Sequence, residues 1–193
     1  MRWLFIMLTF IVMSSGCGAK MIHNYIPYRE IPRDYSLQNA KDDGLVVYEN
    51  GNITSGQSIW GTFVKKAQSG TPCTARLAFY YTLGDPSHYS PAYYEEIKDD
   101  YPVLFIQDLS FDGSAYTLFS IEEGKEYTSE YKYLKQFMEV SPPASAIFTK
   151  REVYVLVNDD DVTWEQIQHG LISSKSGDYI DHKIVYTKYT YKE

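Results

Sequence analysis

One serine of this chain stands at the spacing that serine–lysine catalysis uses. Ser129 and Lys132 are three residues apart, and the chemistry needs both on one helical turn, so that the lysine can take the serine proton. The residues around Ser129 predict a strand instead. The companion Ser-Asp-Asn and Lys-Thr-Gly motifs and a Gly-x-Ser-x-Gly elbow are absent from the sequence, so no serine catalyst is expected.

Metal ligands are the second chemistry to consider. The four histidines are not spaced as ligand pairs. Asp159, Asp160 and Asp161 suggest calcium, but they lack the alternating spacing and the glycine of a calcium loop. They fit a solvated turn before a helix, where negative charge is favourable. We expect no metal and no other cofactor.

Paired carboxylates are the third candidate group. Glu95-Glu96, Asp99-Asp100 and Glu122-Glu123 all fall at predicted loops or strand ends, where exposed charge is usual. Acid–base catalysis would need a cleft that brings two of them together. An unrecognised hydrolase or carbohydrate-active enzyme that uses carboxylates of residues 85–100 stays open as an alternative.

The N-terminus has the pattern of an export signal. Arg2 precedes an apolar run over residues 3–13, which is too short to span a bilayer but suits a signal peptide. Ser14-Ser15-Gly16-Cys17 follows and resembles the lipobox of bacterial lipoproteins, with Ser14 where that family usually has leucine. The resemblance implies a signal peptide over residues 1–16 and a lipid on Cys17, which would hold the protein at the extracytoplasmic face of the membrane. Cleavage after Ala19, which would release a secreted protein, is the alternative.

The second cysteine has no expected partner. The sequence contains two cysteines, and a lipid on Cys17 would leave Cys73 alone, so we expect no intramolecular disulfide. Cys73 lies on the apolar face of an alternating pattern, which predicts a buried and unreactive thiol.

Chain length favours a single globular domain, expected over residues 34–193. The net charge of −7 argues against a nucleic-acid partner. Nineteen tyrosines suit half-buried strands, because each offers an apolar body and a polar tip. Residues 17–33 hold two prolines and several basic residues, which predicts a tether beside anionic headgroups. An ordered strand around residues 22–28 is the alternative.

Periodicity predicts an α+β fold: a mostly antiparallel sheet with about three helices packed on it. Helices are expected at 36–43, 55–69 and 162–173, and strands at 45–49, 73–83, 102–111, 115–121, 126–138, 147–157 and 180–191. Residues 85–100 form a loop around a short helical turn, and the strand at 102–111 should be covered on both sides. Residues 46–83 and 154–191 share a strand–turn–helix–strand order, which is compatible with an internal duplication or with convergent packing.

The most interesting exposed side chains are tyrosines. Tyr127, Tyr131 and Tyr133 share one face of the strand expected at 126–138. Such a row could stack on sugars or form a partner interface. The alternative is that this face packs under a helix.

Several short stretches resemble a family of uncharacterised bacterial lipoprotein domains, known mainly from Gram-positive bacteria. The likeness runs over about residues 34–137. It rests on Tyr35-Ser36-Leu37, Ala40, Gly44, Val46-Val47, Asn50-Gly51, Trp60, Phe63, Gly70, Arg76, residues 99–102 and residues 108–113. The resemblance implies export and lipid anchoring, and it brings no catalytic residues. We therefore expect a non-enzymatic domain that binds a protein or another envelope partner; a purely structural envelope protein is a third hypothesis.

Overall fold

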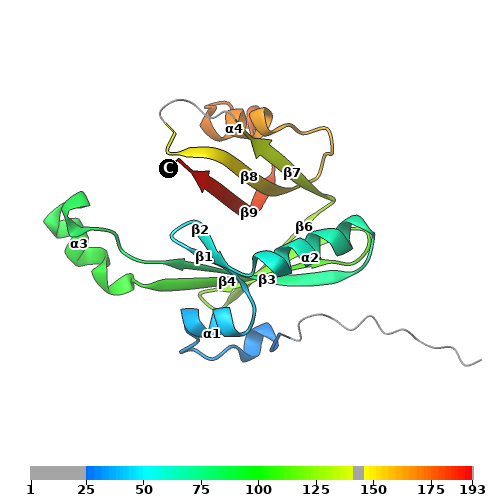
Figure 1. Cartoon of the computed structure of the whole chain (residues 1–193). Coiled ribbons are helices and arrows are strands. Elements are labelled where there is room, and N and C mark those ends of the chain that lie inside the picture. Colours follow the sequence, from blue (N-terminus) through cyan, green and yellow to red (C-terminus); the bar gives the residue numbers. More distant parts are fainter. Residues whose placement is uncertain (1–24, 141–145, 193) are drawn as a thin grey trace, which may run out of the picture.

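The computed structural model describes residues 25–140 and 146–192 and has two sheets stacked in layers (Figure 1). The six strands of sheet A lie in the order β2-β1-β3-β4-β5-β6, and sheet B is β7-β8-β9. Every pairing is antiparallel except β1 with β3. The predicted α+β fold with a mostly antiparallel sheet is confirmed.

Most strands and helices lie close to the expected ranges, but β2 is additional and the range 126–138 contains two strands. The strands are β1 (Val46–Glu49), β2 (Asn52–Ser55), β3 (Cys73–Tyr81), β4 (Val103–Phe111), β5 (Tyr116–Glu122), β6 (Lys125–Tyr131), β7 (Tyr133–Glu139), β8 (Phe148–Val157) and β9 (His182–Tyr191). The α-helices are α1 (Leu37–Asp42), α2 (Gln57–Gln68), α3 (Pro91–Ile97) and α4 (Trp164–Ile172), with 3-10 turns η1 (Tyr28–Glu30), η2 (Pro86–His88), η3 (Lys98–Asp100) and η4 (Ser176–Asp178).

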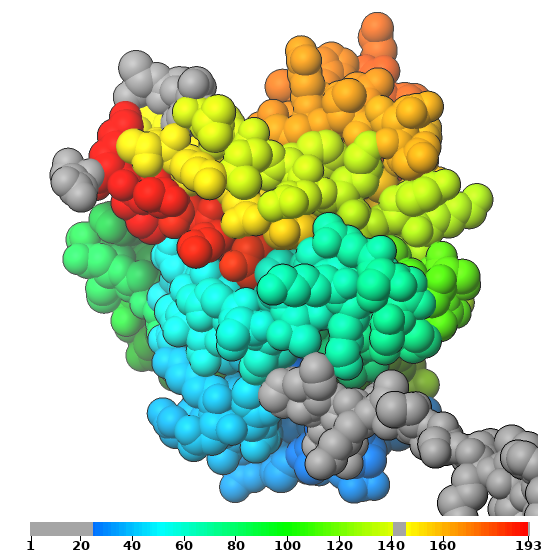
Figure 2. Space-filling view, turned by 45° about the vertical axis from the view of Figure 1, so that its right-hand side comes forward, coloured from blue at the N-terminus to red at the C-terminus, as the bar shows by residue number. Residues whose placement is uncertain are grey.

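The main core lies between the two sheets. One face of sheet A packs against α2 and sheet B, where the ring of Trp60 stacks on Tyr186 at 4.7 Å between centroids. The other face is covered by α1 and the segment before it. Helix α4 covers the far face of sheet B, and Figure 2 shows these layers in sequence from blue to orange.

Local sequence signals set several element ends. Ser36 caps α1 in a reciprocal capping box with Asn39. Asn50 and Gly51 both have positive φ, as a two-residue hairpin turn between β1 and β2 requires. Gly56, also at positive φ, lies so close to Leu45 that a Cβ would collide with the backbone. Helix α2 therefore starts at Gln57 rather than at the predicted Ser55.

The single strand predicted at 126–138 is wrong. It is two strands in different sheets, because β6 ends at Tyr131 and β7 starts at Tyr133. Lys132 lies between them, and its backbone N–H donates to Asn158 Oδ1 rather than to a ladder partner. Alternation of side chains continues across such a junction, so periodicity alone does not reveal it.

The part of the predicted tether that the structure describes belongs to the fold. The Arg76 guanidinium lies over the rings of Tyr25 and Tyr28 and donates to the Ile26 carbonyl at 2.9 Å. Residues 25–31 are thereby fixed to sheet A by a cation that is 3% exposed. A spacer over residues 17–33 is therefore wrong for this portion.

The internal echo does not extend to the topology. In the first unit β1 and β3 pair in parallel, whereas in the second β8 and β9 pair antiparallel. The shared order is thus explained by similar packing needs rather than by a repeated unit. The predicted signal peptide (residues 1–16) and the predicted lipid site Cys17 lie outside the described residues.

Candidate binding site

Sheet A opens into a fork between β4 and β5. The two strands pair only from Asp108↔Phe119 to Phe111↔Tyr116, although β4 starts at Val103 and β5 continues to Glu122. In the opening, the Tyr28 hydroxyl donates to the Ile106 carbonyl at 2.6 Å and accepts from the Ile121 N–H at 3.3 Å. One side chain thus takes the place of a ladder hydrogen bond.

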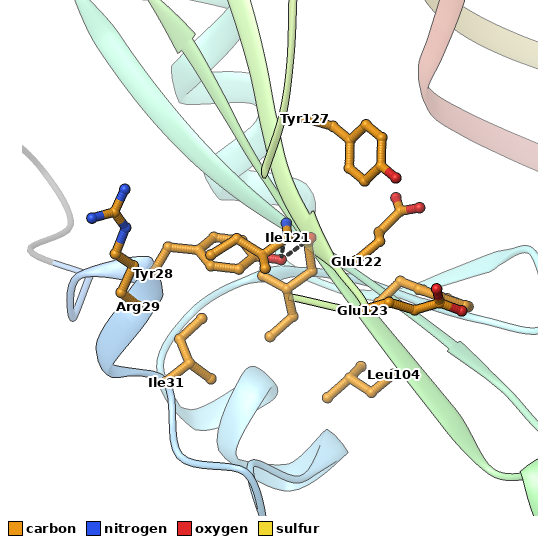
Figure 3. A pocket seen from close by; sticks show the side chains of 10 residues that line it. Tyr28, Arg29, Ile31, Leu104, Ile121, Glu122, Glu123 and Tyr127 are labelled. Carbon is orange, nitrogen blue, oxygen red and sulfur yellow. Dashed lines mark hydrogen bonds between the residues drawn. The ribbon is translucent and has the colours of Figure 1, made fainter. Parts of the chain in front are cut away.

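A hollow of about 660 Å³ lies at this fork (Figure 3). Its walls come from η1, β4, β5, the turn after β5, and β6. The lining residues are Tyr28, Arg29, Ile31, Leu104, Phe105, Ile106, Ile121, Glu122, Glu123 and Tyr127. Binding sites in proteins are typically such concave surfaces, with apolar walls and a few polar groups.

The two faces of sheet A give the hollow two chemistries. Tyr127 is paired with Ser120, two residues before Glu122, so Tyr127 and Glu122 lie on the same face. Figure 3 shows both on one side of the strands, while Tyr28, Ile31 and Leu104 lie on the other. One side is therefore aromatic and acidic, and the other is mainly apolar.

A second groove of about 430 Å³ adjoins the hollow between the sheets. It shares Phe105 and Glu122 with the hollow, and its other lining residues are Phe79, Tyr81, Gln107, Lys183 and Ile184. The rings of Tyr81 and Phe105 meet edge to face at 6.3 Å. Phe105 is 45% exposed, so the prediction that this central strand is covered on both sides is wrong at this position.

Acidic groups dominate the rim of the hollow. Arg29 forms an ion pair with Glu126, which leaves Glu122 and Glu123 as the charged groups of the lining. Burial raises the pKa of the Tyr28 hydroxyl, so this hydroxyl remains protonated and continues to donate. A ligand with a cationic or hydroxyl-rich edge and an apolar face suits these walls.

The three predicted tyrosines are not brought together. Tyr127 lines the hollow and is 50% exposed, whereas Tyr131, at 6% exposed, is part of the main core. Tyr133 is half-exposed on sheet B, because the strand break separates it from the other two. A continuous row of three tyrosines is therefore wrong, and only Tyr127 belongs to the hollow.

Neither a family model, nor a curated protein, nor a solved structure matches this chain. The resemblance to bacterial lipoprotein domains therefore stays a prediction. In the part of the chain that the structure describes, no helix has the length and apolar character to cross a membrane.

A serine, an acid and a histidine come together near α4, but in an order unsuited to catalysis. Ser173 Oγ donates to Asp178 Oδ2 at 2.5 Å, and His169 Nδ1 lies 3.9 Å from the same oxygen. In a serine triad the histidine stands between the serine and the acid and takes the serine proton. Here the carboxylate holds the serine directly, so the cluster fixes the end of α4.

The remaining acidic candidates are on the surface. Asp159, Asp160 and Asp161 are exposed, with carboxylate oxygens within 4.8 Å of one another, and the Asp161 N–H donates to Asp159. Within 85–100, Asp85 accepts from the Ser87 N–H and Glu95 pairs with Lys98. None of these residues lines the hollow or the groove.

Cys73 is buried and carries a free thiol. Its Sγ lies 3.5 Å from the Phe63 carbonyl, and burial raises its pKa. A thiol with a raised pKa is a poor nucleophile, in line with the prediction of an unreactive side chain.

Sequence reasoning missed the residues that hold the hollow in place. Arg76 donates to both carboxylate oxygens of Asp108, at 2.6 and 2.9 Å, from directly opposite positions in β3 and β4. A charged residue at the centre of each of two apolar strands was the available signal. The roles of Tyr28 and Phe105 depend on where β4 and β5 separate, which no local pattern encodes.

Proposed function

We propose that this protein is a lipid-anchored extracytoplasmic binding protein of the bacterial envelope, held through Cys17. The export pattern of residues 1–17 and the resemblance to lipoprotein domains support the location. The gathering of exposed aromatic and acidic side chains at the fork carries the binding role. The alternative is a secreted protein, released by cleavage after Ala19.

The positions of the carboxylates favour binding over hydrolysis. A glycosidase needs two carboxyl groups facing each other across a bond, about 5–10 Å apart. Within residues 85–100, Asp85 caps a turn and Glu95 pairs with Lys98. None of the acids there lines the hollow, whose carboxylates Glu122 and Glu123 are adjacent residues of one chain segment. The lining of the hollow thus offers no pair of carboxylates from two separate segments of the chain.

Metabolic labelling with palmitate tests the anchor. The wild-type chain should incorporate label, and Cys17→Ala should not. Cys73→Ser is the matched control and should label as wild type, because Cys73 is buried in the core. Equal labelling of wild type and Cys17→Ala would contradict the anchor.

Co-sedimentation with the washed, insoluble envelope of the producing cells tests the binding role. The full chain is kept in detergent, so that a lipid alone does not retain it. Tyr127→Ala and Glu122→Gln should each lower retention about tenfold, the loss expected for a well-packed contact residue. Tyr179→Ala removes an exposed tyrosine that does not line the hollow, so it should leave retention unchanged. Unchanged retention of Tyr127→Ala would contradict this site.

A further inference from the structure

The connection between β3 and β4 forms an arm that stands away from both sheets (Figure 1). The arm is residues 82–102 and includes η2, α3 and η3. Not one of its residues is buried. It is attached at its base, where Asn50 and Thr82 exchange two hydrogen bonds.

The arm has regular structure although none of its residues is fully buried. Ser90 caps α3 by accepting from the Tyr93 N–H, and Pro91 occupies its first turn. The ring of Tyr89 lies 6.1 Å from the ring of Tyr93 and 6.1 Å from that of Tyr94, between centroids. A seven-residue helix is unstable in water on its own. Packing of its aromatic side chains against a second surface would stabilise it.

The charge of the arm selects the partner. It carries five acidic side chains against one lysine, a net charge of −4 out of −7 for the whole chain. This charge repels nucleic acid, an anionic membrane and a second copy of this chain. It fits a surface rich in lysine and arginine.

We propose that the arm is a docking element for another protein, which offers a basic surface with an apolar recess for the tyrosines. Tyr93, 51% exposed, is the central anchor, since tyrosine is enriched among the residues that dominate interface energies. The acids around it steer the encounter and exclude partners of like charge. This surface is separate from the hollow at the fork.

Photocrosslinking in the producing cells tests the proposal. A benzophenone amino acid replaces Tyr93 in the full chain, and Tyr179, 55% exposed, is the matched control position. Position 93 should give at least tenfold more of a crosslinked protein product than position 179. Sequencing of that product should place the crosslink in a segment of net positive charge.

Charge reversal makes the test specific. Glu96→Lys with Asp99→Lys removes the net charge of the arm and should lower the product at least tenfold; the milder Glu96→Gln with Asp99→Asn should lower it less. Asp34→Lys with Asp160→Lys makes the same change outside the arm and should leave the product unchanged. Unchanged thermal unfolding should accompany each pair, because all four side chains are exposed.

Four results would overturn the proposal. They are no product above the position 179 control, a product with a second copy, a product with lipid or nucleic acid, and equal loss in both lysine pairs. Loss of envelope retention in Tyr127→Ala with an intact crosslink at position 93 would show that the two surfaces act independently.

Discussion

Two tyrosine hydroxyls make the same pattern of hydrogen bonds in two regions of this molecule. The Tyr48 hydroxyl donates to the Val185 carbonyl at 3.4 Å and accepts from the Thr187 N–H at 3.3 Å, which ties sheet A to the edge of sheet B. The Tyr28 hydroxyl makes the same pair of bonds to Ile106 and Ile121, within sheet A. Each hydroxyl satisfies one backbone acceptor and one backbone donor that no strand reaches.

The surroundings of the two rings differ. Tyr48 is 4% exposed and stacks on Phe79 at 5.0 Å inside the main core. Tyr28 is half-buried at the wall of the hollow, and its ring is perpendicular to that of Phe119 at 5.3 Å between centroids. Tyr48 therefore joins the two sheets and should affect the global free energy of unfolding. Tyr28 connects β4 and β5 where they separate and should affect only the local order of the fork.

Alkaline pH should lower the stability of the folded protein more than any single substitution, because it deprotonates all buried tyrosines together. Burial raises the pKa of Tyr154 and of Tyr186 to about 12, and raises that of Tyr48 as well. The pKa of an unfolded tyrosine is about 10. The folded state holds these protons more tightly than the unfolded state. The contribution of these tyrosines to the free energy of unfolding is therefore fully present below about pH 10 and is lost as the pH rises toward about 12.

Urea unfolding across this window checks the pH effect. The midpoint should stay level up to about pH 10 and then fall steadily. Tyrosinate absorbance of the buried set should appear together with loss of the tertiary circular dichroism signal. A midpoint that stays level to about pH 12 would show that these hydroxyls are not held in the core.

Tyr48→Phe should have the next largest effect. It keeps the stacked ring but leaves the Val185 carbonyl and the Thr187 N–H without their partner. Buried unsatisfied backbone groups cost about 1–3 kcal/mol, which should appear as a lower free energy of unfolding from urea titration. A loss below about 0.5 kcal/mol would mean that water replaces the hydroxyl.

Tyr28→Phe should have a smaller and more local effect, of about 1 kcal/mol. Amide hydrogen exchange at Ile121 should accelerate about fivefold to tenfold, since its N–H donates to this hydroxyl. Exchange at Thr187 should not change. Equal acceleration at both amides would contradict the separation of the two regions.

Tyr127→Ala should have the smallest effect on stability, within about 0.5 kcal/mol, because its ring is half-exposed. Tyr131→Ala, on the same face of β6, is the matched control and should destabilise by about 3–5 kcal/mol, as expected for a buried aromatic residue. Thermal unfolding of both variants makes this comparison. Similar losses would show that Tyr127 is part of the core rather than of a binding surface.

Much of the fold could be predicted, because its signals are local. Ser36 marks a helix start, and Asn50-Gly51 marks a hairpin. The alternation from Cys73 predicts β3, and the helical spacing of Trp60 and Phe63 predicts the buried face of α2. Each depends on residues within a few positions of one another, so tertiary contacts reinforce the local preference.

The site could be predicted only in part. Residue type and strand face single out Tyr127, which lines the hollow. The same signals also select Tyr131, which is buried in the core, and Tyr133, which the change of sheet at Lys132 places in sheet B. The hollow itself depends on where β4 leaves β5 and on a tyrosine nearly eighty positions earlier than its Ile106 partner. Such placements come from long-range packing, and a single sequence carries no periodic signal for them.

The mass of the mature chain from the membrane fraction tests the functional account most directly. We expect a chain that lacks residues 1–16 and begins at a Cys17 carrying a diacylglyceryl group. A soluble chain that begins at Lys20 without lipid, or a chain that still begins at Met1, would contradict it.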